Sequence, residues 1–431
     1  MNIKTVTVIG ANGTIGSNVA GIFASFGDAK VYMVCRKMED SEKAVKKVVM
    51  SVKAASIRVN LIPKDYSELN ECLMKSDFVF ESVSENIDIK KSIYNMITHS
   101  IKKGTIIGTG TSGLSINQLS ENISKEHWPY FMGIHFYNPP YNMVLCEIIP
   151  SKYTDKKIVE QVKLYLTSVL CRNVVELKDF PAFLGNRIGF HFINKALQYA
   201  EKYKSSGGID YIDAIFGGFT GRNMPPIVTS DFVGLDVHKA IIDNIYINGI
   251  DFAHETFAMP EYIQKLIDRN KLGKKTGCGL YQTIINDDGI KTSNVYDIVT
   301  DGYRKRRKYN FSFAQKMIDE IRIGNYNSAI DVLVKDDSIE AKICKKFMVE
   351  YVVYSLVMSN EIGFSIYDAD DVMASGFNWI PPLALVDAFG GNEAFIKFAC
   401  EQEINMKIDY QNVLKNLPHS KYDFRPFFKA K

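Results

Sequence analysis

The apolar and polar positions of the N-terminal segment predict alternating strands and helices. A short β-branched run at 5–9 stops at Gly10, residues 15–26 follow helical spacing, and residues 30–34 form a second strand-like run. A charged amphipathic helix is expected over 41–57, and further strands at 78–80, 105–107 and 130–136. This alternation predicts an α/β domain with a doubly wound parallel sheet over residues 1–182.

Beyond residue 186 the pattern changes to longer helical periods, such as 190–204 and 260–269. Residues 225–234 and 381–390 share the spacing P-P-x4-D-x-x-G, and each is preceded by Gly-Phe. Chance is the alternative for so short a pattern, but the flanking elements agree as well. We therefore expect two all-α domains related by duplication, at 183–283 and 320–431, joined by a polar linker at 284–319.

Composition narrows the class of protein. The chain has 431 residues, 46% of them hydrophobic, and a formal net charge of only +3, which argues against nucleic acid and membrane surfaces as partners. The basic run at 304–308 is typical of a solvated loop, with a secondary anion contact as the alternative. Seven scattered cysteines without a C-x-x-C pair indicate no disulfide framework and no metal site. Together with the absence of a signal-like or membrane-spanning segment, they predict a cytoplasmic protein.

A glycine-rich turn follows the first predicted strand. Gly10, Gly13 and Gly16 are spaced G-x-x-G-x-x-G and precede a predicted helix, where free N–H groups can receive a pyrophosphate. In this context the turn indicates a Rossmann-type dinucleotide site for NAD or NADP. The second strand ends in Cys35-Arg36-Lys37, where an acid for the ribose of NAD is usual. Because two cations attract the 2′-phosphate of NADP and no acid repels it, we expect the site to tolerate NADP. The alternative is that Arg36 and Lys37 are simply two solvated basic side chains in a loop.

An imidazole and a carboxylate lie close together in apolar sequence. His135 precedes Glu147 by twelve residues, and Glu147 lies within an aliphatic segment where an ionised side chain needs a partner. A carboxylate that binds one imidazole nitrogen leaves the other nitrogen able to exchange a proton with an alcohol. The alternative to this acid/base pair is a structural one, in which His135 is a core histidine and Glu147 lies at a strand edge.

Several motifs together resemble the L-3-hydroxyacyl-CoA dehydrogenases. The resemblance runs from Val6 to Gln282, and the C-terminal part is similar to that family's duplicated helical domain. The matching blocks are Phe-Glu-Ser-Val-Ser-Glu-Asn (80–86), Thr-Ser-Gly-Leu (111–114), Gly-Ile-His-Phe-Tyr-Asn-Pro (133–139), Phe-Leu-Gly-Asn-Arg (183–187), Met-Pro-Pro (224–226) with Val-Gly-Leu-Asp (233–236), and Leu-Gly-Lys-Lys-Thr-Gly-Cys-Gly-Leu-Tyr (272–281).

The resemblance implies roles for residues in these blocks. His135 would be the catalytic base and Glu147 its orienting partner, while Ser112 and Asn186 would hold the substrate's oxygens; a helix cap and a helix start are the alternatives for the last two. Cofactor-binding positions in the family correspond to Glu85, Lys90, Asn138 and Lys275, with Ser112 beside them. The glycine turn adds Gly10, Gly13 and Gly16 to the expected cofactor site, and the charge at the end of the second strand adds Arg36. Ser51 and Arg58 fall where the family contacts coenzyme A, or else on a solvated helix face.

The implied activity is the interconversion of (S)-3-hydroxyacyl-CoA and 3-oxoacyl-CoA with NAD(P), a reaction of fatty acid metabolism. A dehydrogenase of a free or carrier-bound 3-hydroxy acid and a non-catalytic dinucleotide-binding protein remain as alternatives.

The sequence departs from the family's pattern in three places that concern the cofactor and the pocket. They are the longer glycine spacing, the missing acid at Cys35, and Thr109-Gly-Thr-Ser-Gly-Leu114 in the serine block. The second helical copy has no counterpart of Asn186 and is expected to be non-catalytic. In family members with one copy, that helical domain forms the dimer interface. A second copy in the same chain could cover this surface, so a monomer is compatible with the sequence and a dimer is the alternative.

Overall fold

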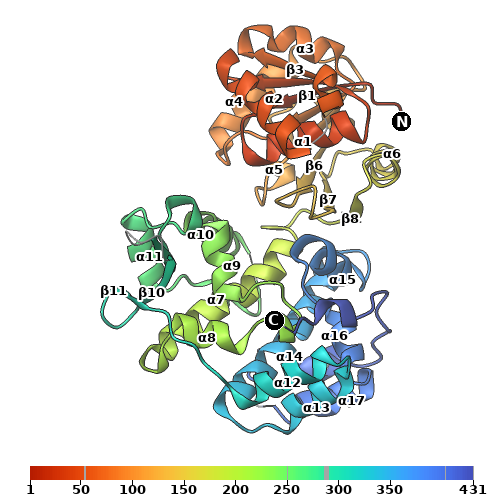
Figure 1. Cartoon of the computed structure of the whole chain (residues 1–431). Helices are drawn as coiled ribbons and strands as arrows, with labels where there is room; N and C mark the ends of the chain where they lie inside the picture. Colours follow the sequence, from red (N-terminus) through yellow and green to blue (C-terminus); the bar gives the residue numbers. More distant parts are fainter. Residues whose placement is uncertain (53–54, 250, 286–290, 403, 431) are drawn as a thin grey trace. The chain divides into compact units, whose positions relative to one another are not determined.

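The computed structural model describes residues 1–52, 55–249, 251–285, 291–402 and 404–430. The chain divides into two compact units (Figure 1). Unit 1 comprises Met1–Phe183 with Ile362–Phe364, and unit 2 comprises Leu184–Glu361 with Ser365–Lys431. Among the helices so described, none is both long and apolar enough to cross a bilayer.

Unit 1 contains an eight-stranded sheet in the order β3-β2-β1-β4-β5-β6-β7-β8. All neighbouring strands are parallel except β6 and β7, which are antiparallel because the connection of residues 137–144 is too short for a crossover. The strands are β1 (Thr5–Ile9), β2 (Lys30–Cys35), β3 (Leu61–Asp65), β4 (Phe78–Glu81), β5 (Ile106–Thr109), β6 (Phe131–Phe136), β7 (Leu145–Pro150) and β8 (Asn173–Glu176).

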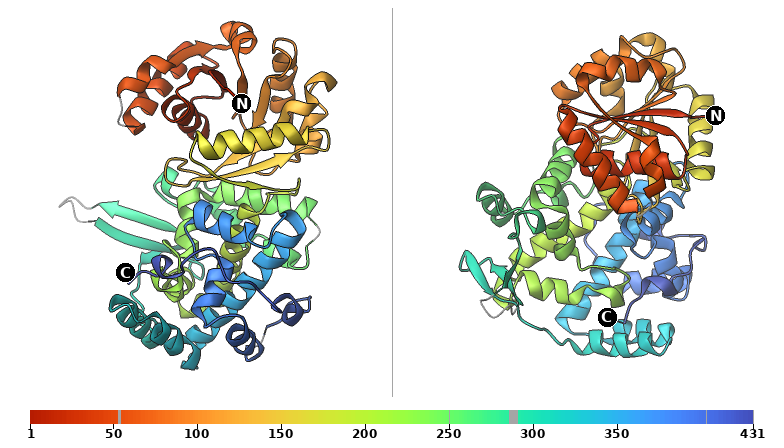
Figure 2. Two further views of the ribbon diagram at one scale, coloured as in Figure 1. Left: turned by 90° about the vertical axis from the view of Figure 1, so that its right-hand side faces the viewer. Right: turned by 45° about the horizontal axis from the view of Figure 1, so that its top comes forward.

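Helices cover both faces of this sheet (Figure 2). Side chains of α1, α2 and α6 share one apolar core with the strands. On the other face Tyr94 of α4 packs edge-on against Phe131, and Ile116 of α5 packs against Gly133. The charged helix expected at 41–57 is α2, which spans 38–52. The helices are α1 (Thr14–Ser25), α2 (Met38–Val52), α3 (Leu69–Lys75), α4 (Ile87–Thr98), α5 (Ile116–Ser120) and α6 (Lys156–Ser168).

Unit 2 is mainly helical. The helices expected at 190–204 and 260–269 are α7 and α11, and each differs from its expected bounds by a few residues at the ends. The helices are α7 (Gly185–Lys202), α8 (Ile209–Ile215), α9 (Pro226–Val233), α10 (Leu235–Asn248), α11 (Glu261–Asp268), α12 (Ser312–Arg322), α13 (Tyr326–Lys335), α14 (Ile339–Ile362), α15 (Asp368–Val372), α16 (Pro382–Ala388), α17 (Asn392–Cys400) and α18 (Tyr410–Val413).

The same buried capping arrangement occurs twice in unit 2. Asp213 accepts hydrogen bonds from the backbone N–H groups of Ile227 and Val228, at 2.8 and 3.0 Å, just after the first Pro-Pro pair. Asp370 accepts one from Leu383 N, at 2.8 Å, just after the second pair. Each carboxylate thus caps the helix that its Pro-Pro pair begins. Burial raises the pKa of both carboxyls to about 7.

The segment expected as a linker, 284–319, carries regular structure. It contributes to an antiparallel sheet in the order β11-β10-β9, formed by β9 (Tyr281–Ile285), β10 (Lys291–Asp297) and β11 (Gly302–Lys305), and to α12. These strands were not predicted because the sheet buries few side chains, so its sequence is mostly polar. Val295 and Tyr296 are among the few that are buried. The basic run begins here as well, and Arg304 binds Asp210 at 2.6 Å.

Candidate active site

His135 and Glu147 are directly opposite each other on two neighbouring strands. The register of β6 and β7 pairs the two residues across the antiparallel ladder. Met132, Ile134 and Phe136, with Cys146 and Ile148, point into the core shared with α1, α2 and α6. Because side chains alternate along a strand, His135 and Glu147 project from the opposite face.

The two side chains form a short, buried hydrogen bond. His135 Nδ1 lies 2.7 Å from Glu147 Oε2; the imidazole is 5% exposed and the glutamate is fully buried. An ionised carboxylate can only accept, so Nδ1 carries the hydrogen and Nε2 keeps its lone pair. Phe183 lies against the imidazole, with ring centroids 5.6 Å apart. The pair is thus an oriented base whose free nitrogen can exchange a proton with a substrate.

Tyr137 belongs to the same cluster and was not singled out from sequence. Its hydroxyl donates to Glu147 Oε2 at 3.0 Å. Its position two residues after His135 was the available signal, because residues i and i+2 of an extended segment point to the same side.

A cavity of about 750 Å³ opens where β1, β2 and β4 end. It is lined by Gly10, Asn12 and Gly13, by residues 35–37, by residues 82–84 and by side chains of α4. The strand order reverses between β1 and β4 at this edge of the sheet, which is where doubly wound folds bind dinucleotides. Tyr66, which follows β3, also lines the cavity. Neither Tyr66 nor residues 82–84 were expected from sequence, since only the sheet order places them beside the glycine turn.

The glycine turn packs too tightly for side chains. Gly10 has φ +80°, and a Cβ there would lie 2.4 Å from the carbonyl oxygen of Ser82. A Cβ on Gly16 would lie 2.5 Å from the carbonyl oxygen of Gly10. Gly13 precedes α1 with no side-chain cap. The first N–H groups of α1 therefore stand at a bare turn that suits a pyrophosphate, so the residues present fit a dinucleotide.

The end of β2 presents two cations to this cavity. Arg36 and Lys37 are exposed and line it, whereas Cys35 is buried and burial raises the pKa of its thiol. Asp40, at the start of α2, is an acidic residue in the same lining.

Lys90 and Glu85 are held by other protein groups beside the cavity. The Lys90 ammonium is buried and binds both oxygens of the buried Glu81, at 2.8 and 3.0 Å, and lies 3.4 Å from Glu85. Glu85 accepts hydrogen bonds from the Thr111 hydroxyl and, at 2.8 Å, from Ser112 N. Glu81 at the end of β4 was not predicted. The network anchors the loop that carries Ser112.

The remaining predicted residues are distributed over both units. In unit 1, Asn138 is exposed just after β6, Ser51 is exposed near the end of α2, and Arg58 is exposed and donates to Leu61 O at 2.9 Å. In unit 2, Asn186 is buried in the first turn of α7, and Lys275 is exposed and pairs with Asp236.

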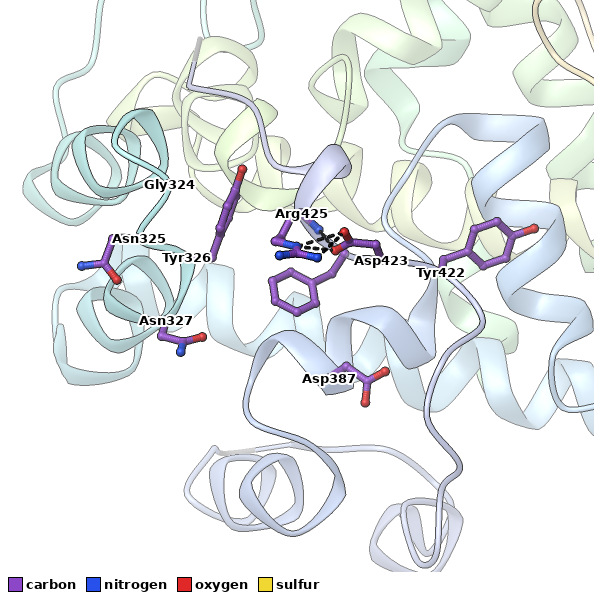
Figure 3. A pocket seen from close by; sticks show the side chains of 9 residues that line it. Gly324, Asn325, Tyr326, Asn327, Asp387, Tyr422, Asp423 and Arg425 are labelled. Atoms are coloured by element: carbon purple, nitrogen blue, oxygen red, sulfur yellow. Dashed lines mark hydrogen bonds and ion pairs between the residues drawn. The ribbon is translucent and has the colours of Figure 1, made fainter.

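Another cavity, of about 510 Å³, lies within unit 2 near the start of α13 (Figure 3). Tyr326 and Asp387 line it. Arg425 also lines it but is bound to Asp423, with Nε at 2.9 Å from both carboxylate oxygens, which neutralises this part of the wall. None of the residues predicted as site residues lines this cavity.

Two family models match consecutive parts of the chain. Residues 5–180 match the NAD binding domain of 3-hydroxyacyl-CoA dehydrogenase, and residues 183–283 match the C-terminal domain of the same enzyme. The chain belongs to the 3-hydroxyacyl-CoA dehydrogenase family. The resemblance inferred from the sequence motifs is thereby confirmed, as is the fold of a Rossmann-type sheet followed by helical structure.

Relatives in this family differ greatly in length. The chain is 30% identical over 332 residues to a Bacillus subtilis protein named "Probable 3-hydroxyacyl-CoA dehydrogenase", which covers 77% of this chain but only 41% of that relative. The chain likewise spans 52% and 59% of two Rickettsia relatives, so about half the length of such proteins is represented here. A 3-hydroxybutyryl-CoA dehydrogenase of Clostridioides difficile is 29% identical over 291 residues, which cover 64% of this chain and 98% of that relative.

Solved structures agree with the fold. The (S)-3-hydroxybutyryl-CoA dehydrogenase of Ralstonia eutropha superposes with a TM-score of 0.56 and 27% identity, over 64% of this chain and 98% of that one. A 3-hydroxybutyryl-CoA dehydrogenase of Escherichia coli reaches a TM-score of 0.69 over 92% of this chain and 94% of its own, at 20% identity. The second match extends the similarity of fold to nearly the whole chain.

Proposed function

We propose that this protein interconverts (S)-3-hydroxyacyl-CoA and 3-oxoacyl-CoA with a nicotinamide dinucleotide. The observation that carries the proposal is the buried His135–Glu147 pair, held in register on β6 and β7 of the domain that matches the family's NAD binding domain. The glycine turn and the cavity beside it would hold the dinucleotide, which accepts or supplies the hydride when bound.

In this proposal the protein supplies the proton chemistry. Nε2 of His135 takes the proton of the 3-hydroxyl in oxidation and returns it in reduction. Glu147 keeps the hydrogen on Nδ1 and stabilises the imidazolium that results. Ser112 and Asn186 are proposed to bind the substrate's oxygen atoms. Burial of the pair favours this role because a low local dielectric strengthens the attraction between the two charged groups.

The test follows the absorbance of the reduced nicotinamide with acetoacetyl-CoA as substrate. Wild-type protein should oxidise NADH or NADPH, and His135→Ala should lose about a hundredfold or more in kcat, as expected when a general acid/base is removed. The control is His99→Ala, which replaces an exposed histidine at the end of α4. Equal rates for His135→Ala and His99→Ala would refute the catalytic assignment.

We propose that the cofactor site accepts NADP as well as NAD. Arg36 and Lys37 line the cavity at the end of β2, and Cys35 stands where an acid would repel a 2′-phosphate. Asp40 in the same lining opposes this effect. Apparent KM values for NADH and NADPH measured side by side decide the matter, and a strong preference for NADH would contradict the proposal.

The proposed binding surface for coenzyme A includes Ser51 and Arg58 on and after α2. Both side chains are exposed, and a guanidinium suits the phosphates of this carrier. Arg58→Ala should raise KM for acetoacetyl-CoA. An unchanged KM would favour a free hydroxy acid or another carrier as the substrate.

We propose that the second helical copy makes the chain a monomer. Within unit 2 the two copies meet through buried aromatic contacts, among them Phe192 of α7 against Phe347 and Tyr351 of α14. Backbone groups also join them, since Ile380 N donates to Gly221 O at 2.8 Å. Light scattering of the full-length protein tests this, and a dimer in solution would contradict it.

A further inference from the structure

The phenol of Tyr137 reaches the carboxylate that orients His135. Its hydroxyl donates to Glu147 Oε2 at 3.0 Å, and the same oxygen lies 2.7 Å from His135 Nδ1. Tyr137 is 7% exposed, and its ring centroid lies 4.6 Å from that of the imidazole, with 61° between the planes. One oxygen of a fully buried carboxylate therefore serves two donors where water has little access.

We infer that Tyr137 is a positioning residue that tunes the basicity of His135 through Glu147, an inference that rests on the acid/base role proposed above. A hydrogen bond from the phenol stabilises the ionised carboxylate and occupies part of its accepting capacity. The carboxylate then favours the imidazolium less than it would without the hydrogen bond from Tyr137. The phenol thereby favours the neutral imidazole over the imidazolium, and a neutral imidazole is what oxidation of an alcohol requires.

Two features make the hydroxyl, rather than the ring, responsible for this effect. The strand register already places His135 opposite Glu147, so the pair does not depend on the phenol for its alignment. The ring of Tyr137 packs against the imidazole through carbon atoms that a phenylalanine would keep. Removing the hydroxyl alone therefore takes one donor away from Glu147 Oε2, while the hydrogen bond to His135 and the ring packing persist.

Other ionisable groups on neighbouring elements of unit 1 are held apart from this change. Cys146 on β7 and Glu176 on β8 lie on the opposite face of the sheet, where Glu176 binds Lys163 of α6 at 2.8 Å. Glu85, beyond β4, binds Thr111 and Ser112 and lies 3.4 Å from the Lys90 ammonium. These groups are the same in a Tyr137 variant, so a change in His135 titration is attributable to the phenol.

The experiment compares Tyr137→Phe with a matched loss of a buried phenol hydroxyl in the full-length protein. The control is Tyr165→Phe on α6; among the groups that the structure describes, the Tyr165 hydroxyl is buried without a hydrogen-bond partner. The imidazole resonance of His135 is titrated by NMR, and its loss in His135→Gln provides the assignment. The titration midpoint should rise by about half a unit to one unit in Tyr137→Phe and stay at the wild-type value in Tyr165→Phe.

Turnover gives a second readout. The acidic limb of kcat/KM for oxidation of 3-hydroxybutyryl-CoA should move to higher pH by the same amount in Tyr137→Phe. In a Glu147→Gln background, adding Tyr137→Phe should leave the NMR midpoint unchanged, because the phenol acts through the carboxylate.

Two results would overturn the inference: equal midpoints in Tyr137→Phe and wild type, or a shift that persists without the Glu147 carboxylate. Absence of turnover with any acyl-CoA would count against the proposed function alone. The NMR titration needs no substrate and still decides the role of Tyr137.

Discussion

Replacing Glu147 with glutamine isolates the contribution of one buried negative charge. The substitution keeps the size of the side chain, and Oε1 of the amide can still accept a hydrogen bond from His135 Nδ1. It removes the charge that faces the imidazole at 2.7 Å between Nδ1 and Oε2. Catalysis should suffer because the imidazole gains positive charge as it takes the proton.

The size of the effect follows from the geometry. Two unit charges with centres about 4 Å apart attract by about 4 kcal/mol at an effective dielectric constant of about 20. In the transition state the imidazole carries only part of its final charge, so about half of this energy, roughly 2 kcal/mol, is lost. That corresponds to about a 30-fold lower kcat. An amide turned to donate toward Nδ1 would favour the wrong tautomer and add to the loss.

The assay measures kcat and KM for acetoacetyl-CoA with saturating reduced cofactor. We expect kcat of Glu147→Gln to fall about 30-fold or more, with little change in KM, because the lost interaction strengthens only as the proton moves. Glu176→Gln on the neighbouring strand is the control, since that carboxylate lies on the opposite face and binds Lys163. A kcat within about threefold of wild type would refute the electrostatic reasoning.

Three further outcomes are expected. Gly10→Ala should abolish dinucleotide binding in a fluorescence titration with NADH, because its Cβ would lie 2.4 Å from the Ser82 carbonyl oxygen; retained affinity would show that the turn can open. Arg36→Ala with Lys37→Ala should raise KM for NADPH about tenfold, as expected when roughly 1.4 kcal/mol of phosphate contact is lost, and raise KM for NADH less; equal changes would place the cations away from a 2′-phosphate. Burial raises the pKa of Asp213 to about 7 in the folded state, so its contribution to stability is present below about pH 4 and is lost as the pH rises through 7. Melting curves of Asp213→Asn should therefore show a larger deficit against wild type at pH 5 than at pH 8, by about 3 kcal/mol, since about two pH units separate pH 5 from the folded-state pKa; a deficit independent of pH would contradict the assignment.

The glycine turn shows how much of a site local sequence can reveal. Strand, turn and helix follow one another within the first 25 residues, and each is specified by nearby residues. The pattern placed Gly10, Gly13 and Arg36 at one expected dinucleotide site, and in the structure these three residues line one cavity. Residues 82–84 were missed as lining, because only the order of strands in the sheet brings the end of β4 beside the end of β1.

Lys90 shows what matching motifs by position leaves open. The resemblance assigns it to the cofactor site, which stays a prediction, and the structure adds that its ammonium is buried against Glu81, nine residues earlier in sequence. A lysine on a helix has many possible partners, and the packing of α4 on the sheet selects one. The strands β9, β10 and β11 were missed for a different reason. Few of their side chains are buried, so the pattern of apolar residues that predicts a strand is weak.

The sequence by itself determined five of the eight strands of the unit 1 sheet (β1, β2, β4, β5 and β6), the repeated Pro-Pro segments and the family. These features arise from local propensity and from the period of apolar residues, which neighbouring positions specify. Only the tertiary structure decided that His135 and Glu147 are cross-strand neighbours, that Tyr137 shares their carboxylate, and that Asp213 and Asp370 cap corresponding helices. Those contacts depend on the register and packing of separate elements, which the short-range sequence pattern leaves open.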